Sequence, residues 1–224
     1  INADSSPKHT LAMRKVAEDA GLTPSLLIVH AELDRGLDEA VARFKRVVDH
    51  AAALGASWLL ELGTGKPEYY TMYFELLDQV VPYAADAGIQ TTLKPHGGVT
   101  LTTEGLIAAY ERVNHPSFGI SYDPGNIIYY TKGEERPEMH IAEVAPLVTT
   151  AIIKDCILVD GVPDVMVTAG DGLVDFPAVL SGLVAGGFRG PLYVECVGGK
   201  TPEEIDANVL RTRKYIQGIL AGLG

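Results

Sequence analysis

The sequence predicts an α/β protein of the (β/α)8 TIM-barrel class, in which six βα units are visible. Short apolar runs recur about every thirty residues and alternate with amphipathic segments, which is the rhythm of a parallel sheet with helices outside. Polar residues directly follow these runs, and in such a barrel the C-terminal ends of the strands carry the active site. A doubly wound open sheet would share the rhythm, but no GxGxxG turn supports it. The barrel is therefore the predicted fold.

The expected strands are short and rich in Leu, Ile, Val and aromatic residues. They cover residues 26–29, 58–60, 90–93, 119–122, 151–153 and 192–194. Six units are two short of eight, so we expect this chain, 1–224, to be one barrel domain that lacks its first two strands. The alternative is an incomplete barrel with an exposed edge, which would need covering or would favour a homodimer.

Helix signals separate these strands. Ser6 precedes a first-turn proline and Gly21 follows the apolar spacing, so a helix is expected between them. The clearest amphipathic stripe runs over residues 37–51 and is closed by Gly55. Further helices are expected over 74–84, 106–113, 139–147, from Asp175 to Gly186, and after the capping box 201–204.

Composition limits the function classes. The 224 residues are 47% hydrophobic, enough for one sizeable core, and no run reaches the roughly 18 apolar residues of a membrane span. A net charge of −11 argues against nucleic acid and against an anionic membrane surface. The two cysteines, Cys156 and Cys196, form no disulfide framework, which favours a reduced, cytoplasmic setting.

Glu195 directly follows the last apolar run, where a carboxylate is costly unless something pairs with it. Other polar residues occupy the same position after the earlier strands, so we expect them to share one mouth of the barrel. Besides Glu195, they are Glu61, Lys94, His96, Asp123, Asn126, Lys154 and Asp155. His30 follows the first strand and could line the same mouth or have only a structural role.

Several motifs in order resemble the xylose-isomerase-like barrels, the superfamily of sugar phosphate isomerases, epimerases and endonuclease IV. Residues 172–180 and 187–195 resemble that family's last unit almost residue for residue. Residues 123–126 resemble its D-x-G-H turn, and 152–155 resemble its H-x-K-D strand end. Lys94-Pro95-His96 lies where the family usually has E-N-H. The resemblance covers essentially the whole chain and implies an enzyme acting on a sugar or sugar phosphate.

The resemblance also implies a divalent metal, Mn, Mg, Co or Zn, held by Glu, Asp, His and Glu, with the two glutamates serving as acid and base. Carried over by position, this set becomes Lys94, Asp123, Ile152 and Glu195. Ile152 cannot bind a metal and an ammonium repels one, so only Asp123 and Glu195 remain as metal ligands if an ion binds. The cofactor therefore stays open. We expect the Lys94 ammonium to take the metal's electrostatic place, paired with both carboxylates, and to polarise a substrate oxygen.

In this mechanism the catalytic residues are Glu195 as general base, Lys94 and Asp123. The substrate-binding candidates form a second set, each with a plainer structural alternative. They are His96, Asn126, Lys154, His30 and Glu61. Lys154 could instead pair with Asp155 and shape the mouth. Glu61 could also compensate for a lost metal ligand.

Tyr129 and Tyr130 could stack on a sugar face, or could form a lid or a subunit contact. Cys156 and Cys196 are interpreted as packing thiols.

Three function classes follow. The first is an isomerase, epimerase or related lyase that removes a proton beside a sugar carbonyl. The second is a non-catalytic barrel that binds a carbohydrate and has lost the metal, which the altered ligand positions favour. The third, an endonuclease IV-like repair enzyme, needs a His-rich zinc cluster and a basic surface, and six histidines with a charge of −11 argue against it.

Overall fold

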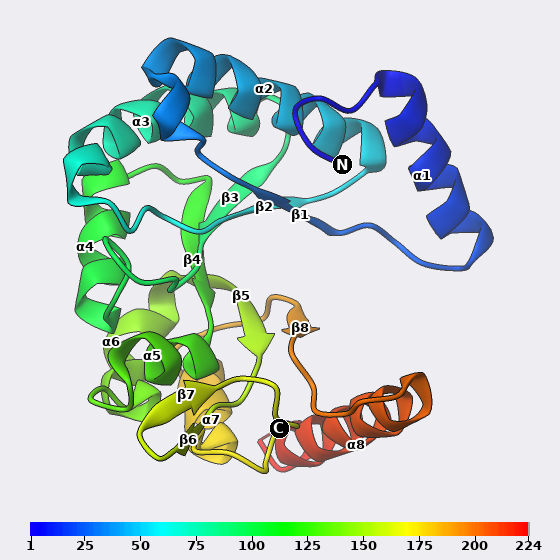
Figure 1. Ribbon diagram of the computed structural model, residues 1–224, viewed down its shortest axis with the longest axis vertical. Helices are drawn as coiled ribbons and strands as arrows, with labels where there is room; N and C mark the ends of the chain where they lie inside the picture. The colour runs from blue at the N-terminus through cyan, green and yellow to red at the C-terminus, as the bar shows by residue number, and fades with distance from the viewer. Residues whose placement is uncertain (224) are drawn as a thin grey trace.

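The computed structural model describes residues 1–223, which form a curled parallel sheet of six strands. The strands are β1 (Leu26–Val29), β2 (Trp58–Glu61), β3 (Gln90–Leu93), β4 (Phe118–Tyr122), β5 (Val148–Ile153) and β8 (Leu192–Val194). They pair in the order β1-β2-β3-β4-β5-β8, every pair parallel. The six expected strands are confirmed, and Figure 1 shows that they curve into a half-barrel.

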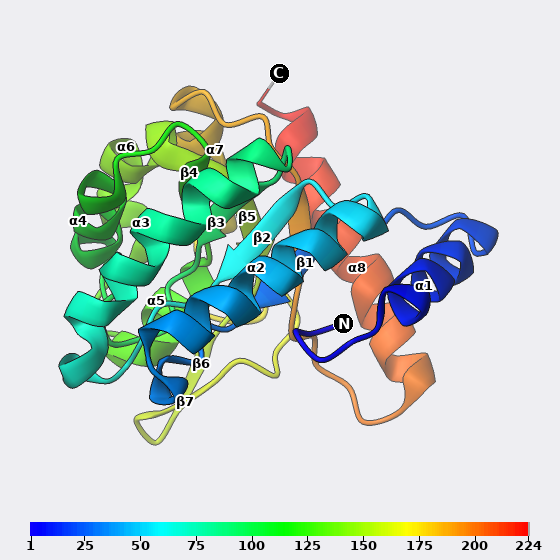
Figure 2. The same cartoon turned by 90° about the horizontal axis from the view of Figure 1, so that it is seen from above.

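Helices follow the strands and cover the convex side of the sheet (Figure 2). Their bounds are α1 (Pro7–Asp19), α2 (Leu37–Leu54), α3 (Tyr70–Asp86), α4 (Thr103–Val113), α5 (Pro124–Thr131), α6 (Ile141–Val144), α7 (Phe176–Ala185) and α8 (Pro202–Ala221). Ser6 caps α1 and Thr201 caps α8 as expected, each accepting a backbone N–H in the first turn.

Three features differ from the sequence expectations. A hairpin of β6 (Ile157–Val159) and β7 (Val162–Asp164) lies in a region expected to be a loop. Helix α5 was expected to be only a turn, and its eight residues include Tyr129 and Tyr130. The helix expected over 139–147 is instead a broken succession of 3-10 and α turns, because Pro146 interrupts it.

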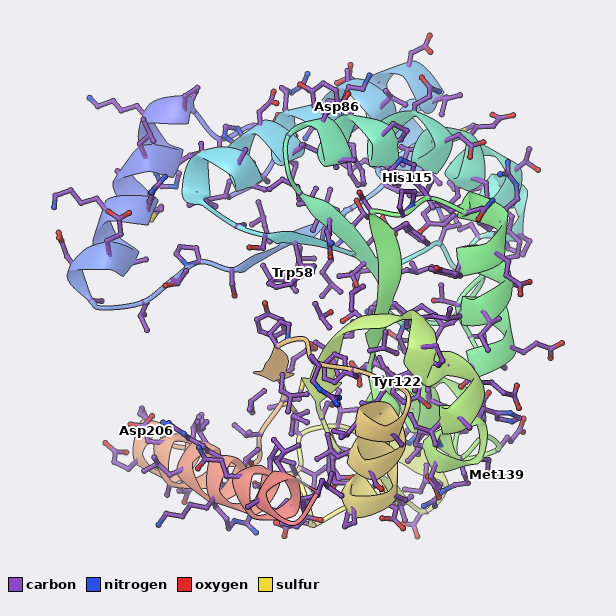
Figure 3. All side chains as sticks on the ribbon, turned by 180° about the vertical axis from the view of Figure 1, so that it is seen from behind. Trp58, Asp86, His115, Tyr122, Met139 and Asp206 are labelled. Atoms are coloured by element: carbon purple, nitrogen blue, oxygen red, sulfur yellow. The ribbon has the colours of Figure 1, made fainter. Side chains whose placement is uncertain are left out.

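The apolar core lies between the outer face of the sheet and the helices. Successive strand residues point to opposite faces, so Leu59 and Leu93 face the helix layer and are fully buried. The predicted stripe of α2 packs against β1 and β2 from outside, with Phe44 only 1% exposed. The concave face is more polar: Thr149 donates to Thr92 across 3.1 Å. Figure 3 shows Trp58 on this concave side and Tyr122 near the middle of the sheet.

The sheet is open between β1 and β8 within the described residues. One hydroxyl pair spans the opening, with Ser25 Oγ 2.9 Å from Tyr193 Oη. Helices α1 and α8 flank the gap on either side (Figure 1), and Ile28 and Val194 are 48% and 42% exposed beside it. Between residues 1 and 223, no helix is long and apolar enough to span a bilayer.

Two loops at the mouth lock together through a glycine. Val99 N donates to Thr64 O across 3.1 Å, which joins the loop after β2 to the loop after β3. Gly98 makes this contact possible: its φ is +56°, and a Cβ there would lie 2.2 Å from Thr64 O and 2.4 Å from Gly65 Cα. The loop that carries His96 is thereby fixed on its neighbour.

We expect Gly98→Ala to lower the free energy of unfolding by about 1–3 kcal/mol more than Gly21→Ala. Gly21 is the matched control, because its φ is also positive, +70°, but a Cβ there meets nothing within 4 Å. Urea unfolding of both variants measures the difference. Equal losses would mean that the two loops separate without cost.

Candidate active site

Four charged side chains from four neighbouring strand ends meet on the concave side of the sheet. Lys94 follows β3, Asp123 follows β4, Lys154 follows β5 and Glu195 follows β8. Alternate residues of a strand point to the same face, and the residue two places before each of these four faces the concave side. All four side chains therefore point to the concave side. The sequence expectation that these strand-end residues gather at one mouth is confirmed for this group, which we call the charge cluster.

Glu195 bridges both lysines of the charge cluster. Lys94 Nζ lies 2.6 Å from Glu195 Oε2, and Lys154 Nζ lies 2.5 Å from Glu195 Oε1. Asp123 Oδ2 lies 3.0 Å from Lys94 Nζ and 3.4 Å from Lys154 Nζ, as an ion-pair contact. Lys94 therefore pairs with Asp123 and Glu195, as the sequence analysis expected.

These contacts favour the charged forms of Glu195 and Lys154. Burial alone would raise the pKa of Glu195, but the hydrogen bonds from Lys154 and Lys94 outweigh it and lower the pKa. Burial alone would lower the pKa of Lys154, but Asp123 and Glu195 outweigh it and raise the pKa. Two ammoniums thus face two carboxylates, and the charge cluster is neutral in sum.

Burial distinguishes Glu195 from its partners. The side chains of Lys94 and Lys154 are 4% exposed and that of Asp123 is 0% exposed, whereas that of Glu195 is 38% exposed. Glu195 is therefore the member of the charge cluster that a ligand meets first.

Asn126 supports Lys154 from the first turn of α5. Its amide nitrogen donates to Pro95 O across 2.8 Å, and its Oδ1 accepts from Lys154 Nζ across 3.1 Å. Asp123 Oδ1 caps the same helix by accepting from Asn126 N. A Cβ on Gly125 would lie 2.6 Å from Lys154 O, so only glycine allows α5 to come this close. Asn126 is buried, and both ends of its amide have protein partners.

His96 and Tyr130 stand beside the charge cluster. The His96 ring lies 5.0 Å from the Tyr130 ring, and Tyr130 also contacts Tyr129 edge to face. Burial, followed by the charges of Lys94 and Lys154, lowers the pKa of His96, so the imidazole is neutral near pH 7. The three rings are thus tilted or edge to face toward one another and form an aromatic cluster beside the mouth.

His30 and Glu61 are not brought into the charge cluster. His30 is exposed and lines a separate hollow with the loop Gly63–Lys66. Glu61 is paired in register with Leu93, so its side chain points to the opposite face from Lys94. It accepts from Tyr73 Oη at 2.8 Å and from Gly63 N at 2.5 Å inside the helix layer.

The expected Lys154–Asp155 ion pair is wrong. Adjacent residues at a strand end point to opposite faces, and Asp155 therefore turns away from Lys154. Its carboxylate accepts four backbone N–H groups and so fixes the loop that precedes α7. The donors are Cys156, Gly170, Gly172 and Val174, at 2.8–3.0 Å.

The fold and this mouth agree with a known family. Residues 3–215 match the family model described as xylose isomerase-like TIM barrel, and the chain belongs to that family. No curated protein is a significant match to the sequence.

Solved structures share the fold at low sequence identity. A xylose isomerase-like TIM barrel protein from Mycobacterium smegmatis, in complex with magnesium, is 20% identical, with a TM-score of 0.81 over 99% of this chain and 81% of that one. A xylose isomerase domain protein from Planctomyces limnophilus is 21% identical, with a TM-score of 0.76 over 97% of this chain and 84% of that one. An L-ribulose 3-epimerase is 17% identical, with a TM-score of 0.70 over 96% and 80%. Epimerases and dehydratases both occur among these similar structures.

The residues of this chain do not fit the divalent metal that the resemblance implies. Lys94 Nζ lies against both carboxylates that could hold an ion. Ile152, 2% exposed, offers only hydrocarbon at the position of the expected histidine. Among residues 1–223, no three His, Cys, Asp or Glu side chains are grouped so that they could hold a metal. The cationic charge at this mouth is supplied by lysines.

A double variant tests this conclusion. Lys94→Glu with Ile152→His restores Glu, Asp, His and Glu at the four positions, so we expect it to hold about one Mn²⁺ or Zn²⁺ per chain after dialysis. Metal analysis by mass spectrometry measures the content, and Lys94→Glu alone is the matched control. Stoichiometric metal in the wild-type protein that disappears in Glu195→Ala would contradict the conclusion that lysines, and not a metal, supply the positive charge at this mouth.

The buried carboxyl group of Glu61 gives a pH prediction. Burial raises its pKa to about 7, against hydrogen bonds from Gly63 and Tyr73 that lower it, and its Oε1 has no hydrogen-bond partner. Because this folded pKa exceeds the unfolded one, the contribution to stability is fully present below about pH 4.5 and is lost as pH rises through 7. We expect a loss of about 3 kcal/mol between pH 4.5 and 8.

Urea unfolding at several pH values measures this slope, and Glu61→Gln should flatten it. Glu68→Gln, which changes an exposed glutamate in the following 3-10 turn, is the matched control and should keep the wild-type slope. A slope that is the same in Glu61→Gln and in wild type would refute the assignment.

Proposed function

We propose that this protein is an enzyme that removes a proton beside the carbonyl group of a sugar or sugar phosphate. The observation that carries the proposal is the position of Lys94 Nζ, held 3.0 Å from Asp123 and 2.6 Å from Glu195 at the strand-end mouth. A fixed, desolvated cation at this mouth stabilises the negative charge that develops on a carbonyl oxygen during proton removal. The family and the epimerases among the similar structures support the reaction class.

The roles follow from exposure and charge. Lys94 and Lys154 are fixed cations that face the oxygens of the substrate, and neither needs to lose its proton. Buried Asp123 is their counterion. Glu195, the exposed carboxylate, is the general base. Its pKa is lowered while both ammoniums hold it, so it becomes a stronger base when a substrate oxygen takes over part of those contacts.

His96 and Tyr130 supply the binding wall. A neutral imidazole exchanges hydrogen bonds with sugar hydroxyls, and the Tyr130 ring presents an apolar face to the C–H groups of a sugar. His30 and Glu61, which lie outside the charge cluster, take no part in this proposal.

Proton exchange with solvent tests the function directly. We expect the wild-type protein to introduce deuterium from D₂O beside the carbonyl of at least one ketohexose or ketohexose phosphate, detected by NMR. Lys94→Met should slow that exchange by about 100-fold or more, because it removes a preorganised charge. A chelator should leave the wild-type rate unchanged. Lys200→Met, in an exposed loop before α8, is the matched control.

Full exchange in Lys94→Met would end the lysine mechanism. Absence of exchange with every sugar, together with retained sugar binding, would identify the second function, a carbohydrate-binding barrel without catalysis. The altered metal positions, Lys94 and Ile152, favour that alternative.

A further inference from the structure

We infer that Glu195 occupies the place of the ligand's own carboxylate, and that the site selects sugars bearing one carboxylate, which displaces Glu195 from Lys94 and Lys154. This inference rests on the sugar-binding function proposed above and adds the chemical class of the sugar to it.

The geometry is that of a bound carboxylate. Glu195 Oε2 accepts from Lys94 at 2.6 Å and Oε1 accepts from Lys154 at 2.5 Å, so the two oxygens of one carboxylate each meet their own ammonium. The ammoniums are almost wholly buried and are fixed from behind by Asp123 and Asn126. They remain in place when the exposed carboxylate leaves, and a carboxylate from the ligand fits the same two donors.

The charges that would remain around a displaced Glu195 are balanced by one negative charge. Without Glu195, the two lysines and Asp123 leave a net charge of +1. Among the described residues that face this point, no other group adds a charge near neutral pH. Burial, reinforced by the charges of Lys94 and Lys154, lowers the pKa of His96, and burial raises the pKa values of Tyr130 and Cys196.

A neutral sugar has no charge with which to replace the Glu195 carboxylate, so Glu195 stays on the two ammoniums. A phosphate dianion would place an excess negative charge beside buried Asp123. A monoanionic carboxylate restores neutrality, and it does so with the same number of charge-assisted hydrogen bonds.

The backbone around Glu195 is suited to its displacement. Glu195 follows β8, a strand of three residues that pairs only with β5 among the described strands. The next residue, Cys196, has φ +53°, an unfavourable value for a residue with a side chain, and Gly199 follows with φ +132°. Lys94, by contrast, follows β3, which has neighbours on both sides. The unfavourable backbone conformation therefore lies on the Glu195 side of the ion pair.

Isothermal titration calorimetry with D-gluconate tests the inference, with D-glucitol as the neutral polyol of the same carbon number and inorganic phosphate as the third probe. We expect Glu195→Gln to bind gluconate about tenfold more tightly than wild type, because removing the competing carboxylate raises the fraction of binding-competent sites. Glucitol should bind both proteins equally weakly. Lys154→Met should lose gluconate binding, with Lys200→Met as its matched control.

Each contrary result overturns the inference. These are equal gluconate affinity in wild type and Glu195→Gln, glucitol binding as tight as gluconate, tighter binding of phosphate than of gluconate, or no gluconate binding by either protein. Lys154→Met removes a buried partner, so thermal unfolding is used to check that this variant folds. If Lys154→Met does not fold, the comparison of Glu195→Gln with wild type still tests the inference. Because these titrations need no turnover, their outcome is separate from that of the deuterium exchange.

Discussion

The ion pairing of two lysines with two carboxylates is the constraint on which the mouth of this half-barrel depends. Lys94, Asp123, Lys154 and Glu195 come from four strand ends that lie next to one another in the sheet. Removing one partner of a buried ion pair leaves an uncompensated charge, which is far more costly than the net gain of forming the pair. Each member thus requires the others, and the strand ends that carry them must stay in register.

The charge cluster also explains how a barrel of this family can be built without the usual ligand set. A metal site concentrates positive charge at one point and holds it with carboxylates. Here the ammonium of Lys94, at the end of β3, lies between the carboxylates of Asp123 and Glu195. An ammonium is held less rigidly than a metal ion, because it has three donors on a flexible side chain, whereas a metal binds several ligands at once. Asn126 and Gly125 compensate by fixing Lys154 from behind.

Much of this architecture was predictable from the sequence, because strand and helix signals are local. The six strands and the stripe of α2 followed from periodicity. The Lys94 pairing with Asp123 and Glu195 followed from the resemblance, which placed these residues at the family's metal-ligand positions. The β6–β7 hairpin was missed, although Asp160-Gly161 is a turn signal between short apolar runs. The alternation of side chains along a strand could have excluded Asp155 and Glu61 from the mouth. Each directly follows a residue that faces the concave side, so each must face the helices. The partners of Asp155 could not have been foreseen, because they lie up to 19 residues away in a loop without periodicity.

The charge cluster joins strands that are not neighbours in the described sheet. Lys94 follows β3 and Glu195 follows β8, and β4 and β5 lie between these two strands. The 2.6 Å contact between Lys94 Nζ and Glu195 Oε2 therefore ties together two strand ends that share no backbone hydrogen bond. One ion pair thus acts as a cross-link over the concave face, spanning three strand-to-strand steps.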